Sequence, residues 1–333
     1  MKWNLIDWHP AESSLTGKTG IESFPHLHRV IKIISRAVSD NLDLVNYNWK
    51  IDPIWAARAS DTLAHLQRWY YDLPSWKRVM ISEMLDSSIA NSKLFSDDDF
   101  DIIEANQKML FKRSAPFETE FQVVASSTLE AIFSCRETLD IDKTLVLNFT
   151  SGMKPWWEFR AWLFTQEDEL IISSWLYLSL ISNELFYLMN RFRSTHFYSD
   201  QMIFSPEVPI IRDAYWELLN KPFPVAFISS PAVNRRMVLK KEPELKDEID
   251  SIMIGRIGKI LAIASANWYE NLILWAWWCG AFWHSAEDVS SYFAWLLLRW
   301  GEFEWRFKNI IFSIYSKGDT NVNYDSFCRK FAI

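Results

Sequence analysis

The stretch NLILWAWWCGAFWH, residues 271–284, sets the expectation for the fold. It holds four of the chain's 19 tryptophans, and its apolar run is uninterrupted from Leu272 to Trp283. A helix that spans a membrane needs about 20 apolar residues, so this run is too short and predicts no membrane span. A helix that is apolar on all sides belongs in a core. We therefore expect a buried helix here, the first arm of a C-terminal helical hairpin.

The rest of the composition also favours helices. Only 8 of the 333 residues are glycine, and glycine is the residue that tight hairpins and phosphate loops use most. Apolar residues recur at helical spacing through much of the chain. The sequence therefore predicts a mainly α multi-helix bundle, with a small β element at about 144–150 and 223–229. Prolines in the second of these strands predict that it lies at a sheet edge.

Proline content predicts how the chain is divided. Six of the 12 prolines fall between residues 199 and 243, which predicts an irregular connector. We expect an N-terminal helical region over 1–198, this Pro-rich connector over 199–243, and a C-terminal Trp-rich helical hairpin region over 244–333.

Charge and cysteine content restrict the partners and the compartment. A net charge of −7 argues against nucleic-acid binding, which depends on Lys and Arg contacts to phosphates, and it suits a basic protein partner. Three cysteines without a CxxC spacing are typical of reduced thiols in a cytoplasmic protein. The sequence has no metal-binding or cofactor motif that we recognise, so we expect neither a metal nor a cofactor.

One motif follows the strand at 144–150. In LVLNFTSGMKPWW, residues 145–157, a hydroxyl, loop amides and a lysine come directly after a strand, a combination that suits phosphate. This stretch resembles the phosphate-contacting loop of CARF domains, which bind cyclic oligonucleotides in prokaryotic defence. The resemblance implies a nucleotide sensor whose phosphate loop is Asn148, Thr150, Gly152 and Lys154.

A second motif is RFRSTH, residues 191–196. Its arginine and histidine resemble the R-x4-6-H signature of HEPN ribonucleases. The resemblance implies an RNA-cleaving protein with Arg191 and His196 as the catalytic pair. The plainer interpretation is that both residues complement the dipole at a helix C-terminus.

These motifs compete with an interpretation without catalysis. The acidic run at residues 167–169 is most simply a solvated helix start, and no complete catalytic constellation stands out. We therefore expect a non-catalytic interaction module, most concretely a bacterial toxin-neutralising immunity-type protein, with Trp156, Trp157 and Trp305 contacting its partner. The defence sensor or ribonuclease is the first alternative, and a viral structural or nucleocapsid-type protein is the second.

Overall fold

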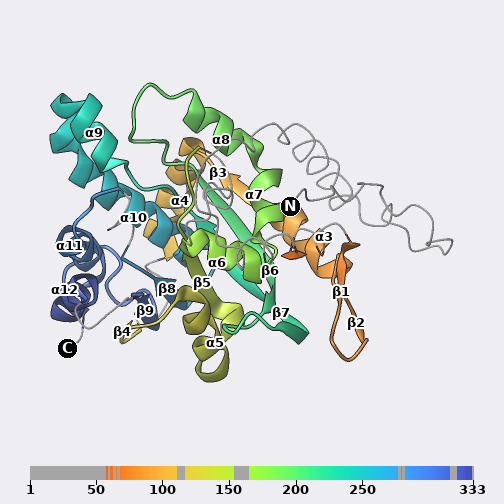
Figure 1. The fold of residues 1–333 in the computed structure, drawn as a ribbon. Helices are drawn as coiled ribbons and strands as arrows, with labels where there is room; N and C mark the ends of the chain where they lie inside the picture. Colours follow the sequence, from red (N-terminus) through yellow and green to blue (C-terminus); the bar gives the residue numbers. More distant parts are fainter. Residues whose placement is uncertain are drawn as a thin grey trace.

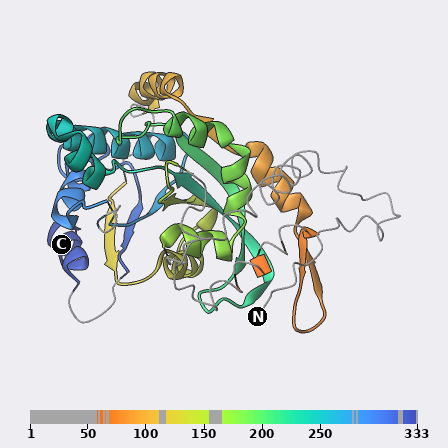
Figure 2. The same cartoon turned by 45° about the horizontal axis from the view of Figure 1, so that its top comes forward.

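A seven-stranded mixed sheet forms the centre of the molecule (Figure 1). The computed structural model describes residues 58, 61, 62, 65, 68–110, 117–153, 165–276, 279, 282–315 and 321–331. The strand order of the sheet is β3-β6-β7-β5-β8-β9-β4. These strands are β3 (Lys93–Phe95), β4 (Glu120–Val124), β5 (Thr144–Asn148), β6 (Met202–Arg212), β7 (Leu218–Ser229), β8 (Asn271–Leu274) and β9 (Asn309–Ser313). A separate antiparallel hairpin, β1 (Tyr70–Asp72) and β2 (Arg78–Met80), projects from one end (Figure 2).

Helices cover both faces of this sheet (Figures 1 and 2). The α-helices are α3 (Ser82–Asn91), α4 (Asp97–Leu110), α5 (Thr128–Thr138), α6 (Gln166–Ser173), α7 (Leu176–Ser182), α8 (Glu184–Arg191), α9 (Arg235–Lys241), α10 (Ile249–Ala266), α11 (Ala286–Leu297) and α12 (Val322–Phe331). Short 3-10 turns, η3 (Ile141–Lys143) and η5 (Pro243–Glu248), precede β5 and α10. Within the described ranges, no helix is both long and apolar enough to cross a membrane.

The alternation of side chains along β5 divides the core into two layers. Successive residues of a strand point to opposite faces. Leu145 and Leu147 belong to the cluster that packs against α10, α11 and α12, while Val146 belongs to the cluster formed with α5, α6 and α7. Because β5 is buried on both faces, it is a short continuous apolar run, as central parallel strands are. The fold is therefore a three-layer α/β sandwich.

Polar residues at the amino ends of the central strands set their register. Thr144 pairs with Asn271, and Asn271 with Asn309, in three parallel strands. The amide of Asn309 donates to Asn271 Oδ1 at 2.7 Å, and the amide of Asn271 lies 3.4 Å from Thr144 Oγ1. A slip of one residue would bury these groups without partners, so the ladder stabilises a single register.

The expected mainly α bundle is wrong, and the Trp-rich stretch shows why. Residues 271–274 form β8, a buried strand paired with β5 and β9, and residues 275 and 276 after it are in neither a helix nor a strand. A run of four buried apolar residues has no periodicity that separates a helix from a parallel strand. The β element at 144–150 is confirmed as β5, but it belongs to a large sheet.

The proline-rich segment also differs from the expectation. It contains β6 and β7, the two longest strands, in place of an irregular connector. β7 lies inside the sheet between β6 and β5, not at its edge. It tolerates Pro222 and Pro224 because β5 pairs only with residues 226–229 of β7. At its prolines β7 therefore has a neighbour on one side alone, β6, in which Pro209 lies opposite Pro224.

Candidate active site

The candidate site lies at the carboxyl end of β5, where the chain leaves the sheet in two directions. The connection after β5 leads to α6, which packs in one core layer, and the connection after β7 leads to α9 and α10, which pack in the other. Ligands of open α/β sheets bind outside the carboxyl ends of the strands at such a switch point. The polar groups at this point are therefore the ones to consider.

Four consecutive polar residues open α6 and are all buried. Gln166, Glu167, Asp168 and Glu169 are each at most 6% exposed. Gln166 fastens the helix to the end of β5, because its side chain accepts from Phe149 N at 2.9 Å and donates to the carbonyl of Leu147 at 2.8 Å. The first turn of α6 is thus held rigidly against the strand. The partial positive charge at the N-terminus of α6 faces the end of β5.

Glu167 is buried against the end of β5. Its Oε1 is 3.4 Å from Asn148 Nδ2, and Asn148 in turn donates to Ser229 Oγ at 2.9 Å. Burial raises the pKa of Glu167 to about 8, and the hydrogen bond from Thr150 only partly offsets this. A carboxyl with this pKa carries its proton at neutral pH, so it is able to donate one.

Two uncharged hydroxyl groups complete the surroundings of Glu167. The hydroxyl of Tyr187 lies 3.3 Å from Thr150 Oγ1, and Tyr187 is buried. Burial, followed by the charge of Glu167, raises the pKa of Tyr187 well above its usual value. The phenol therefore stays protonated and supplies a hydroxyl beside the carboxyl.

The next two acids have different environments. Asp168 closes a capping box with Thr165: its Oδ2 accepts from Thr165 N at 2.9 Å and from Thr165 Oγ1 at 2.7 Å. Glu169 points to the start of α5, where its Oε2 is 3.4 Å from Leu129 N. Burial raises the pKa of Glu169 to about 7. The turn therefore holds two carboxyls, Glu167 and Glu169, whose pKa burial raises, and perturbed pKa values are typical of acid–base sites.

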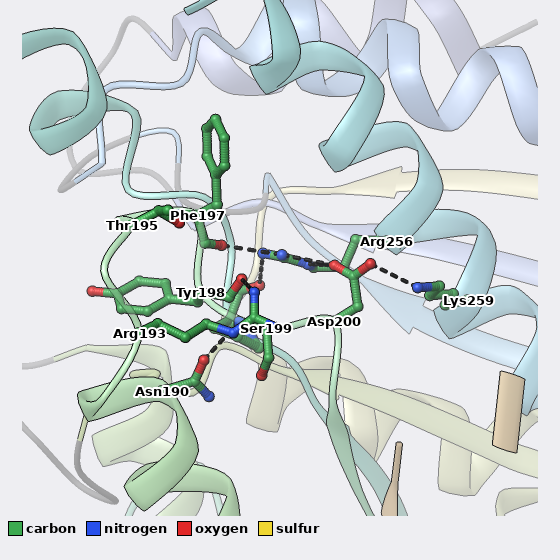
Figure 3. Close-up of polar contacts among 10 residues, drawn as sticks. Asn190, Arg193, Thr195, Phe197, Tyr198, Ser199, Asp200, Arg256 and Lys259 are labelled. Carbon is green, nitrogen blue, oxygen red and sulfur yellow. Dashed lines mark hydrogen bonds and ion pairs between the residues drawn. The ribbon is translucent and has the colours of Figure 1, made fainter. Parts of the chain in front are cut away.

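An ion cluster around the buried Arg256 fixes the loop beside this site (Figure 3). Arg256 on α10 is 1% exposed and donates to Asp200 Oδ1 at 2.8 Å and to the carbonyls of Phe197 and Pro231 at 3.1 and 2.8 Å. Lys259 Nζ donates to Asp200 Oδ2 at 2.6 Å. Burial alone would raise the pKa of Asp200, but Arg256 and Lys259 hold it below its usual value.

The anchored loop packs directly on the segment after β5. A Cβ at Gly152 would lie 2.9 Å from the ring of Tyr198, so the absence of a side chain there allows the ring to close over the backbone. Arg193 and Asn190 hold the same loop through the carbonyl of Tyr198, at 3.2 Å, and the N–H of Ser199, at 2.6 Å. The loop after α8 therefore packs on Gly152, in the described part of the segment after β5.

The structure places the residues of the expected phosphate loop at this site, in different roles. Asn148 and Thr150 are fully buried and contact Glu167 and its neighbours. Gly152 lies under Tyr198. Lys154 lies outside the described residues.

The other expected site residues lie elsewhere. Arg191 is exposed at the end of α8, whereas His196 binds Glu242, with Nδ1 3.2 Å from Oε1. Trp156 and Trp157 lie outside the described residues, and Trp305 is 54% exposed.

Sequence reasoning missed the acidic turn itself. The run at 167–169 was expected to be solvated, yet all three side chains are buried. Its position carried a usable signal: the acids follow a buried strand in the sequence and directly precede the apolar run that starts at Leu170.

Comparisons with known proteins bear on this geometry. Residues 59–213 match the family described as microbial-type PARG, catalytic domain. The poly(ADP-ribose) glycohydrolase of Thermomonospora curvata is 32% identical with a TM-score of 0.77, and the match covers 84% of this chain and 100% of that one. Another structure of that enzyme holds the inhibitor ADP-HPD. The Deinococcus radiodurans enzyme in complex with ADP-ribose is 29% identical with a TM-score of 0.68, over 74% of this chain and 97% of that one. No curated protein matches.

These matches contradict the expected functions. An immunity-type interaction module, a CARF-like sensor, a HEPN-like ribonuclease and a viral structural protein were each inferred for a helical or differently built chain. The chain instead has a seven-stranded mixed sheet, and it matches a glycohydrolase family and a solved glycohydrolase structure. The expected association with immunity or defence is wrong for the same reason.

Proposed function

Because the chain belongs to the microbial-type PARG family, we propose that it hydrolyses the glycosidic bonds between ADP-ribose units of poly(ADP-ribose). The observation that carries the proposal is the buried Glu167 carboxyl at the junction of β5 and α6, with a pKa of about 8. Glycoside hydrolysis uses a protonated carboxylic acid together with a second carboxyl group. The first turn of α6 supplies both within two adjacent residues.

The proposed reaction assigns a role to each carboxyl. The bond between the anomeric carbon and the leaving ribose oxygen breaks, and Glu167 gives its proton to that oxygen. The oxygen of a water molecule bonds to the anomeric carbon, and the proton of that water passes to the carboxylate of Asp168. Thr165 orients Asp168 for this role through two hydrogen bonds, at 2.9 and 2.7 Å.

The same site suits an anionic substrate. ADP-ribose carries a diphosphate, and a cluster of ionised acids would repel it. Burial keeps Glu167 protonated near neutral pH and Glu169 partly so. The N-terminus of α6 faces the site and attracts anions. Residues 148–153 are proposed to approach the diphosphate through their backbone, because the side chains of Asn148 and Thr150 contact Ser229 and Tyr187 around Glu167.

The cellular setting is proposed to be the cytoplasm. Cys135, Cys279 and Cys328 form no disulfide, and Cys135 is buried. Burial raises the pKa of the Cys135 thiol to about 12, so it is unreactive. Free thiols are usual in reducing compartments.

The test is the release of ADP-ribose from purified poly(ADP-ribose), measured by chromatography. Loss of a general acid costs about 10²- to 10⁴-fold in rate, so E167Q and D168N are each expected to lose activity in that range. E137Q, on the exposed face of α5, is the matched control and should be fully active. Absence of release by the unmodified chain, or full activity of E167Q, would contradict the proposal.

A further inference from the structure

The tryptophans occupy backbone conformations that normally require glycine. Among the described residues, nine that are not glycine have a positive φ, and seven of them are tryptophan, with φ between 47° and 72°. They are Trp69, Trp76, Trp216, Trp268, Trp283, Trp300 and Trp305. A bulky side chain in this left-handed region is a steric outlier, whereas glycine adopts it freely. None of the glycines that the structure describes has a φ in this region.

Two of these tryptophans lie in hairpins of the same construction. Between β1 and β2, Leu73 N donates to the carbonyl of Lys77 at 3.0 Å, and Trp76 N donates to the carbonyl of Leu73 at 2.8 Å. Between β6 and β7, the corresponding bonds join Asp213 to Glu217 at 3.0 Å and Trp216 to Asp213 at 2.9 Å. In such three-residue loops the last residue is left-handed and is usually glycine.

A third lies in a helix C-terminal motif. After α10, Tyr269 N donates to the carbonyl of Ala264 and Trp268 N to that of Ser265, both at 3.1 Å. This pair of bonds defines a Schellman motif, in which the residue at the position of Trp268 is left-handed and usually glycine. Trp268 has a φ of 62° and is 59% exposed. Its ring therefore gains little burial to offset the strain.

The amino-acid composition, like the backbone conformation, has tryptophan where glycine is usual. The chain has 19 tryptophans and 8 glycines, whereas average usage gives about 7% glycine, on the order of 23 residues in a chain of this length. The two residue types together number 27, slightly above the usual glycine content of about 23. A binding surface does not explain the pattern, because the β1–β2 turn and the segment after α11, which holds Trp300, lie at opposite ends of the molecule (Figure 1).

We propose that these seven positions are glycine positions, and that the chain made in its own cell carries glycine at them. One codon can specify either tryptophan or glycine. UGA differs from the tryptophan codon UGG in its last base, and it is read as tryptophan in some genetic codes and as glycine in others. The gene therefore has a UGA codon at each of the seven positions, and the host decodes these codons as glycine. None of the other tryptophans that the structure describes has a positive φ, and either codon is compatible with them.

The direct experiment is peptide mass spectrometry of the protein purified from its own cell, together with the sequence of its gene. Peptides with glycine at the seven positions, encoded by UGA, are expected. Peptides with tryptophan at them, or UGG codons behind them, would overturn the proposal. The same peptides give the identity of residues 156 and 157, which lie outside the described residues between β5 and α6.

A stability measurement tests the structural premise on its own. In the chain that carries tryptophan at the seven positions, W76G, W216G and W268G should each raise Tm, on the order of 2 °C. W76A is the matched control, because alanine removes the ring but remains strained at positive φ; it should gain less than W76G. W295G, in the interior of α11 on its exposed side, should lower Tm. A W76G variant no more stable than W76A would refute the premise.

Discussion

Replacing Glu167 by glutamine changes how the stability of the fold depends on pH. The pKa of Glu167 is about 8 in the folded chain, and its ordinary value is 4.5. Below the ordinary value, both the folded and the unfolded chain hold the proton. Between the two values, the unfolded chain releases it and the folded chain retains it. The folded state then binds more protons, so stability falls as the pH rises.

The size of this effect follows from the difference between the two pKa values. Each pH unit in this window costs about 1.4 kcal/mol for one group. From about pH 4.5 to about pH 7, Glu167 therefore removes about 3 kcal/mol from the free energy of unfolding. Glutamine cannot ionise. The stability of E167Q relative to the unmodified chain should thus improve by about 3 kcal/mol across this range.

Urea unfolding followed by circular dichroism at a series of pH values measures this difference. Glu169 contributes in the same direction in both proteins, because its pKa is also raised, to about 7, and its effect cancels in the comparison. E137Q, at an exposed position, should follow the unmodified chain at every pH. A constant difference between E167Q and the unmodified chain from pH 4.5 to pH 7 would refute the assignment of a protonated, buried Glu167.

Further predictions concern the loop beside the site. D200N leaves the buried Arg256 guanidinium without its carboxylate, so urea unfolding should show a loss of about 3 kcal/mol. K259Q, which removes a more exposed partner of Asp200, should cost less than D200N in the same assay. G152A forces a Cβ to 2.9 Å from the ring of Tyr198, and calorimetry should show a lower Tm. In the double variant, Y198A should restore part of the Tm that G152A loses. If the two residues were not in contact, the double variant would show no such restoration.

The sequence predicted local structure well where the pattern was unambiguous. The strand expected at 144–150 is present as Thr144–Asn148. The start of α11, which opens after Ser285, is also determined by neighbouring residues. The capping of that helix by Ser285, whose hydroxyl accepts from Asp288 N at 3.0 Å, is a local interaction that the sequence contains in full. Such features depend on a few neighbouring residues, so tertiary packing did not override them.

The sheet was missed because its strands are short and buried on both faces. Residues 271–274 and 309–313 are apolar runs without alternation, and such runs do not separate strands from core helices. The scarcity of glycine added to the error. It favoured helices in the prediction, whereas the turns that need glycine do exist and hold tryptophan, as at Trp76 and Trp216.

The site was missed because its acids look like a surface pattern. Acidic residues at a helix start are usually solvated and complement the dipole. What changes the environment of Glu167 is contact with Asn148 and Thr150, at the end of a strand that lies between two others. That environment arises only when the sheet is assembled.

The proposed active site is tested most directly by a crystal structure of the chain, in the form that its own cell makes, with ADP-ribose. We expect the terminal ribose at the carboxyl end of β5, within hydrogen-bond distance of the carboxyls of Glu167 and Asp168, and the diphosphate near the N-terminus of α6. ADP-ribose bound elsewhere, or a ribose out of reach of both carboxyls, would contradict it.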